Sequence, residues 1–158
     1  MVAPDRSLAY ERWANRRVLS HLRELPDPPK RTVDLFAHLV AGLTVWLMRL
    51  RSKDSSSVSI WPAMSLDDCE RALGAAEEAM PDALGAVDAQ NLSSTVGYRN
   101  QHGLAYITSI EDILFHLACH GAYHRGQIAL VLRDSGLEPI NTDYITFERE
   151  MAGQPWKP

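Results

Sequence analysis

The sequence predicts a predominantly α-helical chain that folds as one domain over residues 1–158. Apolar residues recur at helical spacing through four long segments. Two of these segments open with Ser-x-x-acid, at Ser65-Leu-Asp-Asp68 and Ser109-Ile-Glu-Asp112, which is a typical helix start. With 158 residues and a hydrophobic content of 46%, the chain is long enough to bury one core without disulfides.

Two helices are expected in the first third of the chain. The first occupies residues 6–25 and ends before a proline-rich segment at 26–29. The second occupies residues 32–51 and is so apolar that it must be largely buried. The serine-rich residues 52–57 are expected to form a loop, because their side chains can bond their own backbone.

The middle of the chain is expected to hold a third helix and a short hairpin. The helix begins at Ser65 and continues to about Met80, where Pro81 prevents simple continuation. Residues 95–98 and 104–108 then flank a polar turn that ends in Gly103. This pattern permits a short β-hairpin between the third and fourth helices.

The fourth helix is expected from Ser109 to about residue 134, with Gly136 just beyond its end. Gly126 lies inside this helix, where glycine costs up to ~1 kcal/mol against alanine, so we expect a neighbouring backbone to come close to it. The tail at 137–158, which includes Trp156, is apolar enough to fold back over the helices or onto a second subunit.

The charge of the chain argues against a nucleic-acid partner. Its net charge is −4 and its pI is near 5.8, whereas phosphate binding needs a clustered basic face. The first helix carries the one dense group of basic residues, Arg12, Arg16, Arg17 and Arg23. Because Glu11 and Glu24 are interleaved with these arginines, we interpret the group as an ordinary solvated helix face.

Secretion and membrane insertion are not predicted. The start of the chain has no apolar h-region, and the most apolar stretch, 33–50, is interrupted by an aspartate, a histidine and an arginine. Cys69 and Cys119 are too few for a disulfide scaffold, and Cys119 is expected to be a small core residue. The chain is therefore expected to be cytoplasmic.

The most informative motif is a series of three histidines in the fourth helix. His116, His120 and His124 are four residues apart, so their rings share one face. Two imidazoles one turn apart can bind a single metal ion. Eight residues rise ~12 Å along a helix, so His116 and His124 cannot both reach an ion that His120 also holds. The spacing predicts one adjacent pair, 116/120 or 120/124, plus a ligand from elsewhere.

His38 is the best candidate for the remaining ligand. It lies in the apolar second helix, where a neutral ring needs a partner. His21, at the edge of an apolar stripe, and His102, in the polar turn, are expected to face solvent. By itself, His38 is more typical of a core histidine bonded to a backbone carbonyl. The histidine pair on another helix shifts the balance toward a metal site.

These histidines belong to a longer pattern. His38 is followed by Trp46, Leu47 and Arg49, and the fourth helix contains His116-x3-His120-x2-Tyr123-His124-Arg-Gly-Gln127. The chain opens with Tyr10-x2-Trp13-x-Asn15 and closes with Leu132-Arg133-x2-Gly136-x2-Pro139. Together these residues resemble the DinB/YfiT-like superfamily over nearly the whole chain.

The resemblance implies a four-helix bundle with an unusual crossover connection and one divalent metal ion held by three histidines. Carried over by position, the ligands are His38, His120 and His124, which selects the second of the two pairs. His116 then lies one turn before that pair, where it is expected to support the ligands or line the pocket. Zn²⁺ and Ni²⁺ both suit imidazole ligands.

Three histidine ligands leave a tetrahedral ion with an open position, as in catalytic sites. Characterised relatives include thiol-dependent S-transferases and isomerases that use bacillithiol, mycothiol or glutathione-like cosubstrates. The resemblance therefore implies a metal-dependent transferase that activates a low-molecular-weight thiol for attack on an electrophile. Two alternatives remain: a non-catalytic dimeric stress-response module with a structural metal, and a metal-dependent hydrolase with His116 or Asp34 as general base.

Trp46, Arg49 and Tyr123 are the candidate residues of the substrate pocket. Trp46 lies two turns beyond His38, near the ion without ligating it, although it is equally typical of a core aromatic. Arg49 could neutralise a cosubstrate carboxylate, or mark where the helix reaches solvent.

A homodimer is also expected. Residues 33–50 are apolar on nearly all faces, more than one contact face in a four-helix bundle uses, and surplus apolar surface usually marks an interface. Superfamily relatives are often dimers, which favours the same state.

Overall fold

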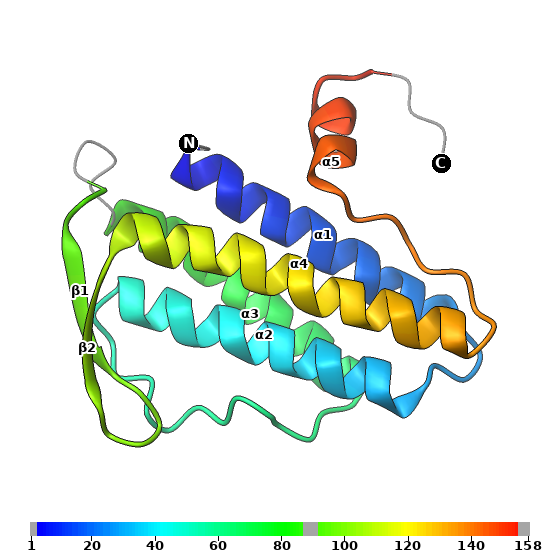
Figure 1. Cartoon of the computed structure of the whole chain (residues 1–158), viewed down its shortest axis with the longest axis horizontal. Coiled ribbons are helices and arrows are strands. Elements are labelled where there is room, and N and C mark those ends of the chain that lie inside the picture. The colour runs from blue at the N-terminus through cyan, green and yellow to red at the C-terminus, as the bar shows by residue number, and fades with distance from the viewer. Residues whose placement is uncertain (1–2, 87–91, 155–158) are drawn as a thin grey trace.

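The structure is a computed structural model that describes residues 3–86 and 92–154. Four long helices form a bundle (Figure 1): α1 (Pro4–Glu24), α2 (Lys30–Leu50), α3 (Leu66–Gly85) and α4 (Ile110–Asp134). An antiparallel hairpin of β1 (Thr95–Arg99) and β2 (Ala105–Ser109) precedes α4, and a short helix, α5 (Tyr144–Met151), follows it. The predicted helical bundle and hairpin are confirmed.

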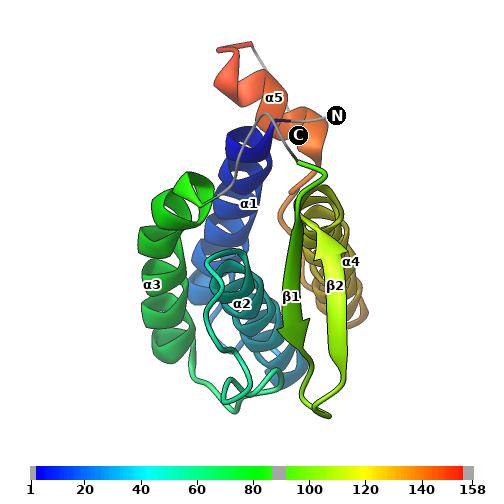
Figure 2. The ribbon, with the colours of Figure 1, turned by 90° about the vertical axis from the view of Figure 1, so that its left-hand side faces the viewer.

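The order of the helices around the bundle is not their order in the sequence. Both α1 and α2 pack against α3 and α4, so α1 and α2 lie diagonally opposite each other (Figure 2). The segment at 51–65 runs back along the bundle, and α2 and α3 therefore run in the same direction (Figure 1). This segment is the predicted crossover connection.

Helix α2 is the central helix, and its apolar surface is covered within the chain. It contacts α3, α4 and β1, and most of its residues are buried. Its length and composition alone would suffice to cross a membrane, but its burial is that of a core helix. The expectation that α2 offers surplus apolar surface to a second copy is therefore wrong, because the hairpin and the neighbouring helices occupy that surface.

The predicted starts of α3 and α4 are formed by serine caps. Ser65 and Asp68 make a reciprocal capping box, and Ser109 accepts a hydrogen bond from the backbone of Asp112. The expected end of α3 near Met80 is wrong, since the helix continues through Pro81 to Gly85. Pro81 lies on the exposed side while Ala83 is fully buried, so core packing outweighs the hydrogen bond that proline removes.

A buried ion pair joins α1 to α4 and corrects two expectations. Glu11, expected on a solvated face, is 2% exposed, and its carboxylate accepts two hydrogen bonds from the Arg125 guanidinium, each 2.9 Å long. Gly121, not Gly126, provides the close approach: a Cβ at Gly121 would overlap the Glu11 carboxylate, whereas one at Gly126 would meet nothing within 4 Å. Burial raises the pKa of Glu11, and the positive charge of Arg125 opposes this shift.

The tail folds back on α1. This is one of the two arrangements that were expected from the sequence. Tyr10 donates a hydrogen bond to the carbonyl of Thr142, and Phe147 of α5 packs against Tyr10 and Trp13. Trp156 lies outside the described residues.

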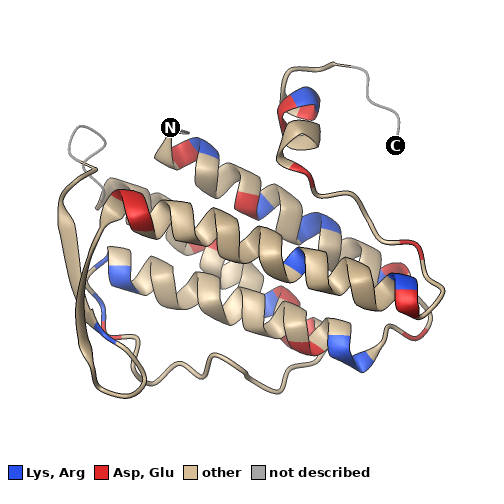
Figure 3. Cartoon of the chain, in the orientation of Figure 1, with Lys and Arg blue, Asp and Glu red and all other residues tan. Residues whose placement is uncertain are grey.

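The arginines of α1 bind carboxylates of neighbouring helices. Arg16 pairs with Glu77 of α3, and Arg17 pairs with Glu150 of α5. Acidic and basic residues are interspersed over the helices (Figure 3), as expected for a face that carries both signs.

Candidate metal centre

Three histidines from two helices converge beside the middle of the bundle. His38 comes from α2, and His120 and His124 come from adjacent turns of α4. One ring nitrogen of each can be chosen so that all three lie within 4.8 Å of one another. This arrangement can hold one divalent metal ion.

The crossover segment orients the His38 ring. Its Nδ1 donates a hydrogen bond to the carbonyl of Ile60, 2.5 Å away, so the proton is on Nδ1 and Nε2 is free to bind a metal. The next residue, Trp61, stacks on the same ring with centroids 3.8 Å apart and planes 10° apart. Ile60 therefore binds the edge of the His38 ring, and Trp61 packs against its face.

The two histidines of α4 are also held in place. The Nδ1 of His124 lies 2.8 Å from the side-chain oxygen of Gln127, so this nitrogen donates and Nε2 stays available for a metal. The His120 ring lies against Gly42 of α2, where an added Cβ would come within 3.1 Å of Cε1. Gly42 thus leaves room for the central ligand.

Burial keeps the two α4 ligands in their neutral form. It lowers the pKa of His120 to about 4, and neighbouring His124, His38 and His116 act in the same direction. It also lowers the pKa of His124, although the bond to Gln127 opposes the shift. Neutral imidazole is the form that binds metal.

A second group of side chains continues from the histidines along the α2–α4 contact. The His116 ring lies 5.3 Å from that of His120 and 5.0 Å from that of Trp46, measured between centroids. The Arg49 guanidinium packs against the rings of both Trp46 and Tyr98, 4.5 and 4.2 Å from their centroids.

Arg49 is a buried cation that packs against aromatic rings and donates to a hydroxyl group. Its side chain is 9% exposed, and its Nε donates a hydrogen bond to Ser55 Oγ, 3.2 Å away. Within residues 3–86 and 92–154, no carboxylate forms an ion pair with it. Burial lowers the pKa of Arg49.

Comparison with known proteins places this chain in a family. A sequence model of the DinB family matches residues 1–156. The chain belongs to the DinB family. Protein DinB of Bacillus subtilis (strain 168) is 24% identical over an alignment of 155 residues, gaps included; the match covers 85% of this chain and 87% of that protein. The crystal structure of a DinB-like protein from Bacillus cereus ATCC 10987 has the same fold, with a TM-score of 0.61, 19% identity and coverage of 85% and 92% of the two chains.

In this DinB-family chain, the site residues expected from the sequence fall into two groups. His38, His120 and His124 converge, and His116 lies beside them without joining the cluster. Tyr123 is 64% exposed, with its ring 5.1 Å from that of His124, so it borders the site from the solvent side.

Four other polar residues of the DinB-family chain lie outside the cluster. Asp34, the alternative general base, is bound to Lys30 at 2.7 Å. His102 is exposed as expected, whereas His21 is half-buried and its Nε2 lies 2.7 Å from the carbonyl of Glu138. Cys119, expected in the core, is exposed because it lies on the outer side of α4.

Sequence reasoning missed the residues that orient the ligands. Ile60 and Trp61, which hold His38, come from a loop, where no periodicity links them to the histidines. Gln127 was visible as part of the DinB-family motif, three residues after His124, which is a helical spacing that lets two side chains meet. The spacing of His124 and Gln127 was the one sequence signal that pointed to a residue orienting a ligand.

Proposed function

We propose that this chain is a metal-dependent transferase that activates a low-molecular-weight thiol for attack on an electrophilic substrate. The observation that carries the proposal is the convergence of three oriented imidazoles beside exposed side chains. Trp61 is 49% exposed and Tyr123 is 64% exposed, so solvent and small molecules reach the rim of the site. A structural metal would instead be sealed by its surroundings.

The residues favour thiol chemistry as follows. When bound, Zn²⁺ or Ni²⁺ would lower the pKa of a thiol, so that the sulfur is deprotonated at neutral pH. The sulfur then forms a bond to the electrophilic carbon while the bond to the leaving group breaks, and the leaving group departs with the electron pair. The thiol proton is released to solvent or to His116, which lies beside His120.

Arg49 supports a cosubstrate that carries a carboxylate. A buried guanidinium gains most from an anion that can share its remaining N–H donors. The rings of Trp46 and Tyr98 pack against the guanidinium, whose Nε and one terminal nitrogen donate to Ser55 Oγ and to the carbonyl of Arg99, so its remaining N–H donors are the ones left for such a contact. A thiol acid bound this way would extend from Arg49 past Trp46 and His116 toward the three histidines.

The test compares two thiols with monochlorobimane as the electrophile and Zn²⁺- or Ni²⁺-loaded protein. Glutathione carries carboxylates and cysteamine carries none. We expect conjugation to require both metal and protein, and His38→Ala to abolish it. Arg49→Gln should raise KM for glutathione at least about tenfold, leave the KM for cysteamine unchanged and leave metal content unchanged. Metal-loaded protein that accelerates conjugation of neither thiol, nor of bacillithiol or mycothiol, would refute the proposal.

Hydrolysis without a thiol is the competing reaction, and the same assay separates it. Asp34 is held by Lys30, so His116 is the remaining general base beside the site. Ester hydrolysis that needs the metal but no thiol would favour the hydrolase. A metal that raises the unfolding temperature and supports neither reaction would favour a structural role.

The proposal also places the chain in the cytoplasm, where low-molecular-weight thiols are kept reduced. Both cysteines are free, which agrees with a reducing compartment. Fractionation of cells that express the untagged chain tests this placement.

A further inference from the structure

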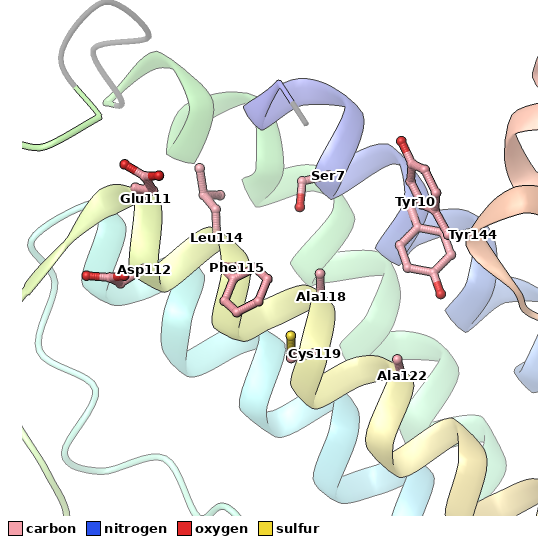
Figure 4. Close-up of a pocket in the computed structure, with 10 residues that line it drawn as sticks. All are labelled: Ser7, Tyr10, Glu111, Asp112, Leu114, Phe115, Ala118, Cys119, Ala122 and Tyr144. Atoms are coloured by element: carbon pink, nitrogen blue, oxygen red, sulfur yellow. The ribbon is translucent and has the colours of Figure 1, made fainter. Parts of the chain in front are cut away.

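A cavity of about 640 Å³ lies between α1, α4 and α5 (Figure 4). Its volume falls in the range of sites that bind small molecules. None of the residues that line it is a candidate metal ligand. The cavity is therefore separate from the candidate metal centre, and an inference about it is independent of the proposed function.

Aromatic side chains line the cavity. Tyr10 and Tyr144 lie at one end, with their ring centroids 5.1 Å apart and their planes at 77°. The hydroxyl of Tyr10 donates a hydrogen bond to the carbonyl of Thr142, which fixes this wall. Phe115 borders the cavity from α4 and is 70% exposed, so its ring is available to a ligand. Aromatic rings bind both apolar groups and cations.

A buried hydroxyl points into the cavity. Ser7 of α1 is 8% exposed, and its side chain points toward α4 (Figure 4). Within residues 3–86 and 92–154, its hydroxyl takes part in no hydrogen bond. A buried polar group without a partner is unfavourable, so a ligand that hydrogen bonds with Ser7 is favoured over one that cannot.

The charged side chains that line the cavity are acidic. Glu111 and Asp112 lie at the end away from the two tyrosines, and the ten lining residues that the structure describes include no lysine, arginine or histidine. Asp112 already accepts a hydrogen bond from Ser109, whereas Glu111 forms no ion pair within residues 3–86 and 92–154. The positive end of the α4 dipole offsets only about half a unit charge. This end of the cavity therefore favours a cation.

We propose that the cavity binds an amphipathic amine, a molecule with an apolar body and one protonated amino group. The apolar body packs against Phe115 and the two tyrosines. The ammonium group donates a hydrogen bond to the Ser7 hydroxyl and is attracted by the negative charge of Glu111. An anion is disfavoured, because the lining offers two carboxylates and no cation to pair with it.

The chain contains its own reporter of occupancy. Cys119 lines the cavity and is exposed, so a ligand bound there shields its thiol from a neutral disulfide reagent, 4,4′-dithiodipyridine. Cys69 is buried, and its raised pKa keeps it protonated at pH about 8, so it does not contribute. The rate of labelling of the full chain therefore measures binding in this cavity.

The first test compares octylamine, octan-1-ol and octanoate, each below its micellar concentration, at pH about 8, where an alkylamine is protonated. Saturating octylamine should slow the labelling of Cys119 at least about fivefold. Octan-1-ol should need an at least about fivefold higher concentration for the same protection, and octanoate should give none. Free cysteine, whose labelling no probe should slow, is the control. Equal protection by octanoate and octylamine, or protection by neither amine nor alcohol, would overturn the proposal.

The second test changes the charge and then the space. Glu111→Gln should raise the octylamine concentration for half-protection at least about threefold and leave that of octan-1-ol unchanged. Glu78→Gln, at an exposed carboxylate of α3, is the matched control and should change neither. Ala118→Leu, which fills the cavity, should abolish protection by both probes while circular dichroism remains that of the parent.

Two results of this second test would contradict the proposed ligand class. One is an equal effect of Glu111→Gln and Glu78→Gln on octylamine, which would remove the role of charge. The other is labelling of Cys119 that slows as the protein is concentrated without any probe, which would show that a second copy covers the cavity in place of a ligand.

Discussion

His38 of α2 and Trp61 of the crossover segment stack face to face, with ring centroids 3.8 Å apart. The carbonyl of Ile60, one residue earlier, accepts the Nδ1 proton of the same histidine. The loop that lets α2 and α3 run in the same direction therefore also fixes the orientation of a metal ligand. Ile60 and Trp61 therefore link the crossover segment to the candidate metal site.

The three converging histidines should each be required for metal binding. His38→Ala, His120→Ala and His124→Ala each remove one of three ligands, so metal affinity should fall by more than about a hundredfold, beyond what loss of an orienting residue costs. Metal content after dialysis measures this.

The other three histidines are matched controls for this experiment. His21→Ala, His102→Ala and His116→Ala should retain metal, because none of these rings belongs to the cluster. A His38→Ala variant that binds metal as tightly as the parent would show that the ion is not shared between α2 and α4.

The residues that orient the ligands should affect affinity without supplying a ligand. Trp61→Ala and Gln127→Leu should each lower metal affinity by about 10- to 100-fold, because the freed rings must then be ordered by the metal itself. Competition with a chromogenic chelator gives the affinities. Trp61→Phe, which keeps a stacking face, and Gln154→Leu, an exposed amide of the tail, should leave the affinity unchanged.

Two glycines of α4 should respond to alanine with opposite sign. Gly121→Ala should destabilise the fold by about 3 kcal/mol, because the added Cβ displaces the Glu11 carboxylate from Arg125. Gly126→Ala should stabilise it by about 0.5–1 kcal/mol, since that Cβ meets no neighbour and alanine favours the helix. Denaturant unfolding at submicromolar concentration, where association contributes least, measures both. Equal effects at the two positions would disprove the close approach of α1 at Gly121.

The two thiols should differ in reactivity. Burial raises the pKa of Cys69 to about 11, from 9.0, while Cys119 is exposed. In dilute protein, a thiol reagent at pH about 8 should label Cys119 alone and reach Cys69 only after unfolding. Because the folded chain holds the Cys69 proton longer, stability should fall as pH rises from about 9 to about 11. Labelling of Cys69 in folded protein at the rate of Cys119 would contradict its burial.

Much of the secondary structure was predictable from local sequence patterns. The starts of α3 and α4 were predictable because a serine cap and an acid three residues later act within a single turn. The hairpin was predictable from its polar turn and Gly103, which adopts a positive φ of 77°. The end of α3 was not, because burial of Ala83 beyond Pro81 depends on helices that are distant in sequence.

The sequence by itself determined that two adjacent histidines of one helix share a face, since helical geometry alone sets that spacing. The antiparallel register of α2 against α4 decided which pair meets His38. In that register His38 lies opposite His120 and His124, Gly42 lies against His120, and Trp46 lies beside His116. The pairing of Glu11 with Arg125 and the stacking of Trp61 on His38 were likewise decided by tertiary structure. Such contacts join residues far apart in the chain, and their geometry follows from the packing of whole helices, which no local pattern encodes.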